Sequence, residues 1–306
     1  MKRVLLLYHA YPFAIASYFR HALEKRPDVE LYTCGAFTND IIPWGGGMRL
    51  PAKYVKPLNL PMPPSIVAPT WQMIAQKTQR TFDLILNIDA GYHLADKPDM
   101  PYAVVATDPH ALKDVGWYTK VRPNADYFFN MQKYDQYQLG GDIHLPYACS
   151  PDHHFAMSDV QKEYDACLIG LHYEQRTKLV SALRQNGYKV FYELGLIYDE
   201  YRWHNNKSRI GLNWSNQMDI NARTFEIMAM RLVPVINRLP HLDDLGFEEG
   251  RHYLGFENID EAVEQVRWAF ANPETSDTIA NNAYQLVHEK HTYDLRVQQI
   301  FDAVGL

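Results

Sequence analysis

The chain has 306 residues, of which 47% are hydrophobic, 13% aromatic and 22% charged, a composition that excludes an intrinsically disordered protein and fits about two globular domains. Its formal net charge of −6 is uneven, because residues 154–306 carry 15 Lys and Arg against 22 Asp and Glu. This balance excludes a domain that is basic overall, as a general nucleic-acid binder would need, and leaves only a local basic groove in the first half open.

No apolar stretch approaches the roughly 20 residues that a membrane-spanning helix needs. Residues 1–8 imitate a signal peptide, but their apolar run is too short, so we predict a buried first strand instead. The three cysteines, Cys34, Cys149 and Cys167, are scattered and show neither a disulfide framework nor zinc-ligand spacing. We therefore expect a cytoplasmic protein with free thiols.

The first half is predicted to alternate strands with helices. Strands are expected at residues 3–7, 29–34, 84–88, 102–106, 127–129 and 143–145, with a helix at 13–25. Residues 43–69 interrupt this pattern with seven prolines and three consecutive glycines, as long binding loops or disordered segments do. The alternation predicts a parallel, doubly wound α/β sheet.

A second α/β unit is expected to begin after residues 150–154. Strands are predicted at 164–170, 188–192, 209–214 and 232–236, and helices at 174–186, 197–206, 221–230, 259–271, 275–290 and 293–304. The predicted domains are residues 1–153 and 154–290, followed by a C-terminal helix at 291–306. Two such domains facing each other would bind ligands at the carboxyl ends of their strands.

The most informative local pattern lies at residues 211–226, where a strand, a polar loop and a helix start follow one another. Asp219 or Asn221 is placed to cap that helix. Arg223 falls in its first turn, where the helix dipole disfavours a cation unless an anion binds nearby. Glu226 follows at i+3, so the pair could bind a diphosphate and a ribose, or could form an ion pair on a solvated face.

Gly170 and Arg176 form a second, weaker pattern between a strand and a helix. A glycine at a strand end lets a phosphate approach the backbone, and an arginine one turn into the helix can reach the same phosphate. A glycine at this position is also common in sheets that bind nothing.

In the first half, Asp89 and His93 follow one predicted strand, and Asp108 and His110 follow the next. Asp and His are the usual general bases for activating an acceptor hydroxyl. The alternative for the second pair is structural, with Asp108 starting a turn and His110 capping a helix.

Four neighbouring residues, Cys149, Asp152, His153 and His154, could suggest a metal cluster. Adjacent histidines rarely reach one ion together, and distant ligands are missing. No metal site is therefore predicted.

The segment from Asn213 through Asn221-Ala-Arg223-Thr-Phe-Glu226 resembles the signature of the CgeB-type, spore-maturation glycosyltransferase-like proteins. Supporting likenesses include Asp108-Pro-His110, Leu145-Pro146-Tyr-Ala, Asn272-Pro273 and His291-Thr-Tyr293 with Arg296. The resemblance covers most of the chain from about residue 100 onward.

This resemblance implies a GT-B fold of two Rossmann-like domains, with a nucleotide-sugar bound mainly by the second and the last helix crossing back to the first. It implies that Glu226 holds the ribose and that Arg223, Arg176 and the Gly170 turn face the diphosphate. It also implies that neither a metal nor a further cofactor is needed, because protein cations and helix dipoles stabilise the leaving group.

The sequence departs from the family pattern at two positions. Arg231 stands where the family usually has a glycine after the signature helix, so either the turn differs or Arg231 points to solvent. Met218 occupies the first position of the Glu-x7-Glu pair of many retaining enzymes, where Asp219 could substitute.

The function predicted from the sequence is metal-independent glycosyl transfer from a nucleotide-sugar to an acceptor hydroxyl. The acceptor could be a glycan, a lipid-linked sugar, a small molecule or a hydroxymethylated base in DNA. Two alternatives stay open: a nucleotide-sugar epimerase on the same fold, and a non-catalytic two-lobed sugar-binding protein.

Overall fold

The fold is taken from a computed structural model, which describes residues 1–11, 14–36, 56–63, 65–66, 68–88, 92–108, 117–133, 142–215 and 217–306. The chain divides into two compact units: unit 1 is Met1–Pro146 with Tyr293–Leu306, and unit 2 is Tyr147–Thr292. The sequence analysis places the first boundary at residue 153 and the second at residue 290. Residues 147–153 go with unit 2 because the Cys149 N–H donates to the carbonyl of His291 at 2.9 Å, and Cys149 bridges Thr292.

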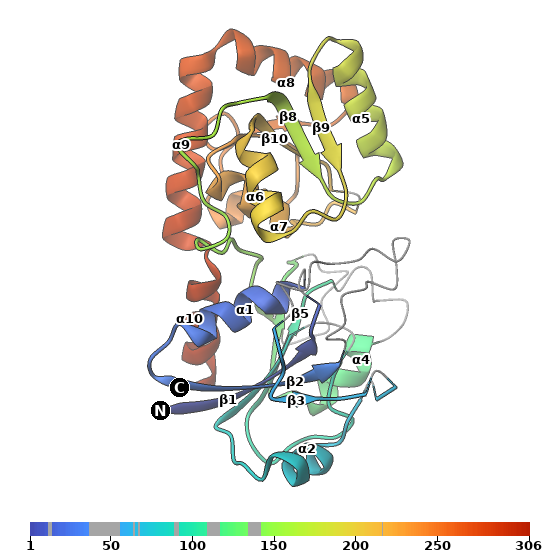
Figure 1. The fold of residues 1–306 in the computed structure, drawn as a ribbon, viewed down its shortest axis with the longest axis vertical. Helices are drawn as coiled ribbons and strands as arrows, with labels where there is room; N and C mark the ends of the chain where they lie inside the picture. Colours follow the sequence, from blue (N-terminus) through green and yellow to red (C-terminus); the bar gives the residue numbers. More distant parts are fainter. Residues whose placement is uncertain are drawn as a thin grey trace. The chain divides into compact units, whose positions relative to one another are not determined.

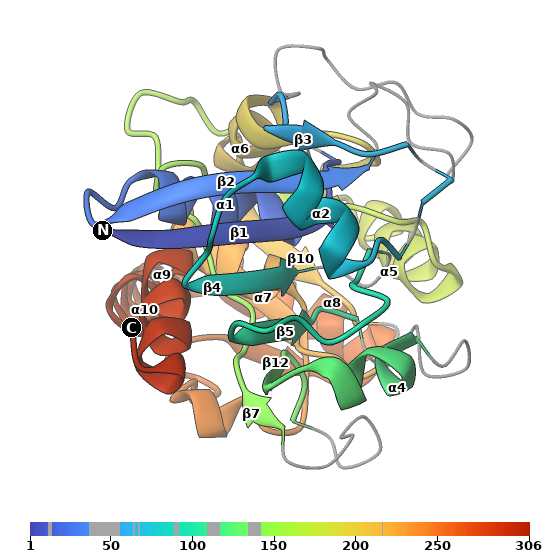
Figure 2. The same cartoon turned by 90° about the horizontal axis from the view of Figure 1, so that it is seen from below.

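Unit 1 contains a parallel sheet in the order β3-β2-β1-β4-β5-β6-β7 (Figures 1 and 2). Its strands are β1 (Lys2–His9), β2 (Val29–Ala36), β3 (Leu60–Pro61), β4 (Leu84–Ile88), β5 (Tyr102–Ala106), β6 (Tyr127–Asn130) and β7 (Ile143–His144). Its helices are α1 (Ile15–Glu24), α2 (Trp71–Thr78), α4 (Trp117–Val121) and α10 (Tyr293–Val304), with a 3₁₀ turn at η2 (Arg122–Asn124). The predicted strands are present. The structure also contains α2, α4 and β3, which the sequence analysis did not predict.

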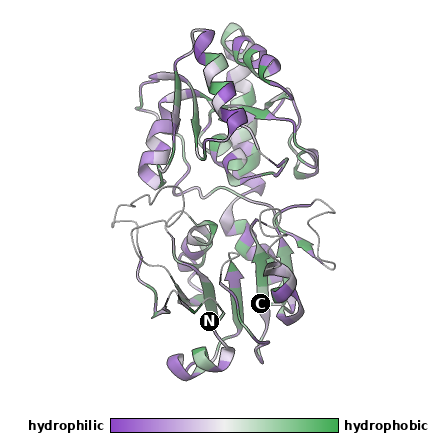
Figure 3. Ribbon diagram, turned by 90° about the vertical axis from the view of Figure 1, so that its right-hand side faces the viewer, coloured by the Kyte–Doolittle hydropathy of each residue, from purple (hydrophilic) through white to green (hydrophobic). Residues whose placement is uncertain are grey.

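The strands of unit 1 are apolar on both faces because helices cover both. Leu5 and Leu7 of β1 pack into a core that includes Ile74 of α2 and Val121 of α4. Tyr18 and Phe19 of α1 lie on the opposite face, against α10. Figure 3 shows the resulting pattern, with hydrophobic strands and helices that are hydrophilic on one side.

Unit 2 contains a second parallel sheet in the order β12-β11-β10-β8-β9 (Figure 1). Its strands are β8 (Tyr164–Ile169), β9 (Val190–Glu193), β10 (Ser208–Asn213), β11 (Val233–Asn237) and β12 (Leu254–Phe256). Its helices are α5 (Glu174–Gln185), α6 (Tyr198–Asn206), α7 (Ala222–Ala229), α8 (Ile259–Ala271) and α9 (Pro273–Lys290), with a 3₁₀ turn at η4 (Asp243–Leu245). Every strand pair in both sheets is parallel, as predicted.

Alternation along β8 shows how the sheet of unit 2 is sandwiched. Ala166 and Leu168 pack into a core with residues of α5, α8 and α9. Cys167 and Ile169 point to the other face, where Tyr201 of α6 covers them. Because successive side chains of a strand point to opposite faces, the four buried residues at the end of β8 serve both layers.

The last helix, α10, belongs to unit 1 although it follows unit 2 in the chain. The ring of Tyr293 stacks on Tyr18 with centroids 5.3 Å apart and meets Phe19 edge-on at 5.0 Å. The buried Arg296 donates from Nε to the carbonyl of Pro146 at 2.7 Å. These contacts attach the C-terminal helix to the α1 face of unit 1.

All three cysteines are free and buried. Burial raises the pKa of the Cys34 and Cys167 thiols to about 12, so both are protonated and serve as apolar packing groups. Within the described ranges, none of the helices combines the length and apolarity needed to cross a membrane.

Candidate functional site

The carboxyl ends of the central strands of unit 2 bring polar residues together at one edge of the sheet. Gly170 directly follows β8, Asn213 ends β10 and Asn237 ends β11. β8 and β11 flank β10, so these three positions are neighbours. This is the edge at which open α/β sheets bind their ligands.

Two guanidinium groups converge on Gly170. A Cβ atom at this position would lie 2.0 Å from Nη2 of Arg223 and 3.7 Å from Nη1 of Arg176. The φ angle of +147° at Gly170 also favours glycine. The missing side chain therefore makes room for both arginines above the backbone turn.

Among the residues that the structure describes, neither arginine forms an ion pair with a carboxylate, although the charge of Arg176 interacts with Asp219 and that of Arg223 with Glu226. Arg176 donates to the carbonyls of Trp214 at 2.8 Å and Leu171 at 3.0 Å. Arg223 donates from Nη1 to Oδ1 of Asn213 at 3.1 Å, while its Nε is buried without a hydrogen-bond partner. Burial, and secondarily the charge of Arg223, lower the pKa of Arg176 to about 9, so Arg176 remains charged at neutral pH.

The start of α7 adds backbone donors to the same place. Asn221 stands at the predicted N-cap position, but its side chain does not cap the helix. Its Oδ1 instead accepts from Nδ2 of Asn213 at 3.0 Å. The expected capping hydrogen bond to the side chain of Asn221 is thus absent, and among the described residues no other side chain, Asp219 included, accepts from the N–H groups of the first turn. An uncapped helix start next to two cations favours a bound anion.

Glu226 is buried one turn into α7, so the predicted alternative of an Arg223–Glu226 ion pair on a solvated face is wrong. The hydroxyl of Tyr201 donates to its Oε2 at 2.7 Å. His154 Nδ1 accepts from the N–H of Ser150 at 3.1 Å, so its proton lies on Nε2, which is 3.7 Å from Oε1 of Glu226. Burial raises the pKa of Glu226, and the Tyr201 hydrogen bond and the Arg223 charge partly oppose this.

The loop between β10 and α7 is held by side chains of the same strand ends. Asn237 accepts from the N–H of Ser215 at 2.8 Å. The hydroxyl of Ser215 in turn donates to Asp219. Asp219 therefore lies in the loop that precedes α7. Met218, which replaces the earlier glutamate of the Glu-x7-Glu pair, has a φ of +60° and is exposed.

The predicted acceptor-side residues of unit 1 are only partly within the described chain. Asp108 follows β5 and is exposed, and His93 is half-buried after β4. Burial, with a smaller effect of the Lys120 charge, lowers the pKa of His93, so its imidazole is neutral at pH 7 and can accept a proton. Asp89 and His110 lie outside the described residues.

A buried polar network supports the carboxyl edge of the unit 1 sheet. Asn87 at the end of β4 donates to the carbonyls of Leu7 at 3.1 Å and Tyr92 at 2.5 Å. The hydroxyl of Tyr102 donates to Oδ1 of Asn87 at 3.2 Å. His9 ends β1 with its ring 5.8 Å from that of Tyr92, and its burial lowers its pKa to about 4.

The His153-His154 pair serves structural contacts. His153 Nδ1 lies 2.8 Å from the hydroxyl of Ser150, and His154 packs edge-on against Tyr201. In the part of the chain that the structure describes, no group of three or more Cys, His, Asp or Glu side chains is placed to hold a metal ion.

Comparison with solved structures places this arrangement among known folds. HepE from Anabaena, solved with UDP and glucose, superposes with a TM-score of 0.69 at 11% sequence identity, over 100% of both chains. Sucrose-phosphate synthase from Thermosynechococcus elongatus superposes with a TM-score of 0.66 at 11% identity, over 99% of both chains. The chain has the GT-B fold of glycosyltransferases.

One further comparison concerns the second half of this GT-B chain, and two concern the whole chain. Residues 154–302 match the family model described as glycosyl transferase-like. An alpha-glucosyltransferase solved with UDP-glucose and DNA containing an abasic site also superposes, with a TM-score of 0.66 at 11% identity over 99% of both chains. No curated protein matches the sequence significantly. The predicted GT-B fold is confirmed, whereas the CgeB-type assignment stays a prediction.

The structure brings together all seven predicted donor-side residues at or beside one sheet edge of this GT-B chain: Gly170, Arg176, Asn213, Asp219, Asn221, Arg223 and Glu226. Three further residues were missed by the sequence predictions: His154 and Tyr201, which face Glu226, and Asn237, which holds the loop at Ser215. Asn237 directly follows the strand predicted at 232–236, so its position was a usable signal. No sequence signal marked Tyr201 and His154, because they reach Glu226 from segments that are distant in sequence.

Proposed function

We propose that the protein is a metal-independent glycosyltransferase that takes a sugar from a UDP-sugar and transfers it to an acceptor hydroxyl. The observation that carries this proposal is the convergence of Arg176 and Arg223 on Gly170 without a carboxylate partner. Two like charges held together repel each other unless an anion lies between them. The solved relatives that contain UDP or UDP-glucose support a uridine diphosphate as that anion.

In this proposal, the bond between the anomeric carbon and the diphosphate oxygen breaks, and a bond from the acceptor oxygen to that carbon forms. The negative charge that develops on the departing UDP is stabilised by the two guanidinium groups and by the first-turn amides of α7. Glu226, oriented by the Tyr201 hydroxyl, accepts hydrogen bonds from the ribose.

The acceptor proton needs a base, and unit 1 supplies the candidates. We propose Asp108 or His93 for this role, with Asp89 and His110 as the further candidates from the sequence. The neutral imidazole of His93 suits it at pH 7. The acceptor itself is a glycan, a small molecule or a hydroxymethylated DNA base, and each class can be tested directly.

Isothermal titration with UDP, GDP, TDP and CMP, each with Mg²⁺ and with EDTA, tests the donor site. We expect UDP to bind equally in both buffers and to bind about tenfold or more weakly in Arg223→Ala. Arg251→Ala removes an exposed arginine paired with Glu248 in the same unit, so it should leave the affinity unchanged. Equal UDP affinity in Arg223→Ala and the parent protein would overturn the donor site.

Activity is read as UDP release from UDP-sugars in the presence of each acceptor class. Release that depends on one acceptor supports transfer. Free sugar or an epimerised donor without any acceptor would support the epimerase alternative, and binding without turnover would support the non-catalytic one.

A further inference from the structure

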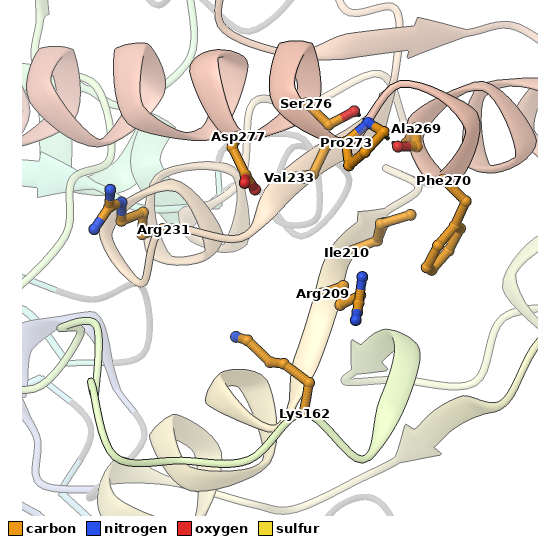
Figure 4. A pocket seen from close by; sticks show the side chains of 10 residues that line it. All are labelled: Lys162, Arg209, Ile210, Arg231, Val233, Ala269, Phe270, Pro273, Ser276 and Asp277. Atoms are coloured by element: carbon orange, nitrogen blue, oxygen red, sulfur yellow. Dashed lines mark hydrogen bonds between the residues drawn. The ribbon is translucent and has the colours of Figure 1, made fainter.

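A second cationic pocket lies in unit 2, at the sheet edge opposite the donor site. We call it the α9 pocket. It has a volume of about 210 Å³ and is lined by Lys162, Arg209, Ile210, Arg231, Val233, Ala269, Phe270, Pro273, Ser276 and Asp277 (Figure 4). Arg209 and Ile210 begin β10, whose last residue, Asn213, lies in the donor site. The two sites therefore occupy opposite ends of the same strand.

The cations of the α9 pocket differ from most others in this acidic unit. Six lysines and arginines of unit 2 each pair with a carboxylate: Lys178, Arg202, Lys207, Arg238, Arg251 and Arg267. Within the described residues, Lys162, Arg209 and Arg231 form no such pair. Lys162 and Arg209 thus line the pocket without an ion pair, whereas the exposed Arg231 lies at its rim and donates to Asn281.

The groups around the pocket suit a ligand that has both an anionic group and a hydrogen-bond donor. Lys162 Nζ donates to the carbonyls of Asn206 at 2.8 Å and Ser208 at 2.9 Å, which fixes the ammonium in place. Lys162 and Arg209 line the same pocket. The pKa of Lys162 is lowered, mainly by burial and further by the charge of Arg209, and the charge of Asp277 partly opposes this. Figure 4 shows the carboxylate of Asp277 on the other side of the cavity, pointing inward.

The remaining walls add a flat apolar surface and a helix start. The guanidinium of Arg209 lies 5.9 Å from the ring centre of Phe270. α9 begins at Pro273 with no side-chain cap, so its positive dipole end adds to the field of Lys162 and Arg209. Two cations against one carboxylate leave a net positive pocket, in which Asp277 is a strong hydrogen-bond acceptor.

We propose that the α9 pocket binds a small phosphorylated molecule that also carries hydroxyl groups, such as a sugar phosphate. The phosphate would contact Lys162 and Arg209, and a hydroxyl would donate to Asp277. The volume admits a ligand smaller than a nucleotide-sugar, which agrees with a site distinct from that of the donor.

Binding is measured by isothermal titration in the Arg223→Ala background, which weakens anion binding at the donor site. The probes are glucose 6-phosphate, inorganic phosphate and glucose, at constant ionic strength set with NaCl. We expect glucose 6-phosphate to bind more tightly than phosphate, and glucose not to bind. Arg209→Gln should weaken both anions about tenfold, because a charge-assisted hydrogen bond is lost. Asp277→Asn should remove most of the preference for the sugar phosphate.

The matched control is Arg267→Gln, which removes an exposed arginine of α8 that pairs with Glu264 outside the pocket. It should bind both anions as tightly as its parent. Equal affinity of Arg209→Gln and Arg267→Gln for glucose 6-phosphate would overturn the proposal, as would binding of none of the probes. Phosphate binding as tightly as glucose 6-phosphate would overturn the hydroxyl-recognition part. None of these outcomes depends on whether UDP binds at the donor site.

Discussion

At the scale of single residues, Gly170 decides whether the donor site can exist. Its φ of +147° is strained for any other residue, and the space of a Cβ is already filled by Arg223. The sequence shows only a glycine between a strand and a helix. Its importance comes from Arg176 of α5 and Arg223 of α7, whose guanidinium groups lie above it.

We expect Gly170→Ala to destabilise unit 2 by about 1–3 kcal/mol and to weaken UDP binding about tenfold or more, because Arg223 must move. The control is Gly187→Ala, where φ is +87° and no atom lies within 4 Å of the new Cβ. This control should cost stability but leave UDP affinity unchanged. Thermal unfolding and titration of both variants test the prediction, and equal affinities would contradict it.

His9 makes the stability of unit 1 dependent on pH. Burial lowers its pKa from 6.5 to about 4, so below pH 6.5 the unfolded chain takes up a proton that the folded chain does not. Stability is therefore lost as the pH falls from 6.5 to about 4, by about 3 kcal/mol in total.

Urea unfolding of the parent and of His9→Gln at pH 7 and pH 4.5 measures this effect. Because glutamine does not titrate, the variant should lose less stability between the two pH values. An identical loss in both proteins would show that His9 does not carry the pH dependence.

At the scale of elements, α7 links the donor site to the opposite edge of the sheet. It carries Arg223 in its first turn and ends in a Schellman motif, in which the N–H of Leu232 donates to the carbonyl of Ile227 at 3.2 Å and that of Arg231 donates to the carbonyl of Met228 at 3.0 Å. Such a motif normally places glycine where Arg231 stands, with a φ of +59°. The turn is therefore the ordinary one, Arg231 is exposed at its end, and its side chain donates to Asn281.

We expect Arg231→Gly to stabilise the protein by about 1 kcal/mol, because glycine relieves the left-handed strain. Arg231→Ala loses the same bond to Asn281 but keeps the strain, so it should be no more stable than the parent. Thermal unfolding compares the three proteins. A glycine variant less stable than the alanine variant would contradict the prediction.

At the scale of the whole molecule, unit 1 is built from two distant parts of the chain. α10 returns after unit 2 and covers α1 through Tyr293 and Phe301, which are almost fully buried. Unit 1 therefore cannot complete its core until residues 293–306 have been added, whereas unit 2 is continuous.

We expect Tyr293→Ala to destabilise unit 1 by about 3 kcal/mol, because a large buried ring and its contacts with Tyr18 and Phe19 are lost. Hydrogen exchange should then become faster in β1 and α1 but not in the strands of unit 2. Leu295→Ala, at a position 37% exposed on the same helix, is the control and should change little. Equally faster exchange in both units would contradict a role confined to unit 1.

Local sequence patterns predicted both parallel sheets except for the short strands β3 and β12, and they placed the expected donor-side residues at one sheet edge. Apolar runs that alternate with amphipathic helices specify parallel strands, and the carboxyl ends of such strands meet at one edge, so Gly170, Asn213 and Arg223 could be placed without a structure. The GT-B fold and the glycosyl transferase-like second half agree with this prediction.

Only the tertiary structure decided which partners those residues meet. The structure shows that Glu226 is buried and bonded to Tyr201 and that Asn221 turns to Asn213 instead of capping α7. It also shows that Lys162, Arg209 and Asp277 line one pocket at the far edge. A sequence pattern reveals only which residues share a face of one helix or strand. Contacts between side chains of different elements depend on how whole elements pack, so no local pattern predicts them.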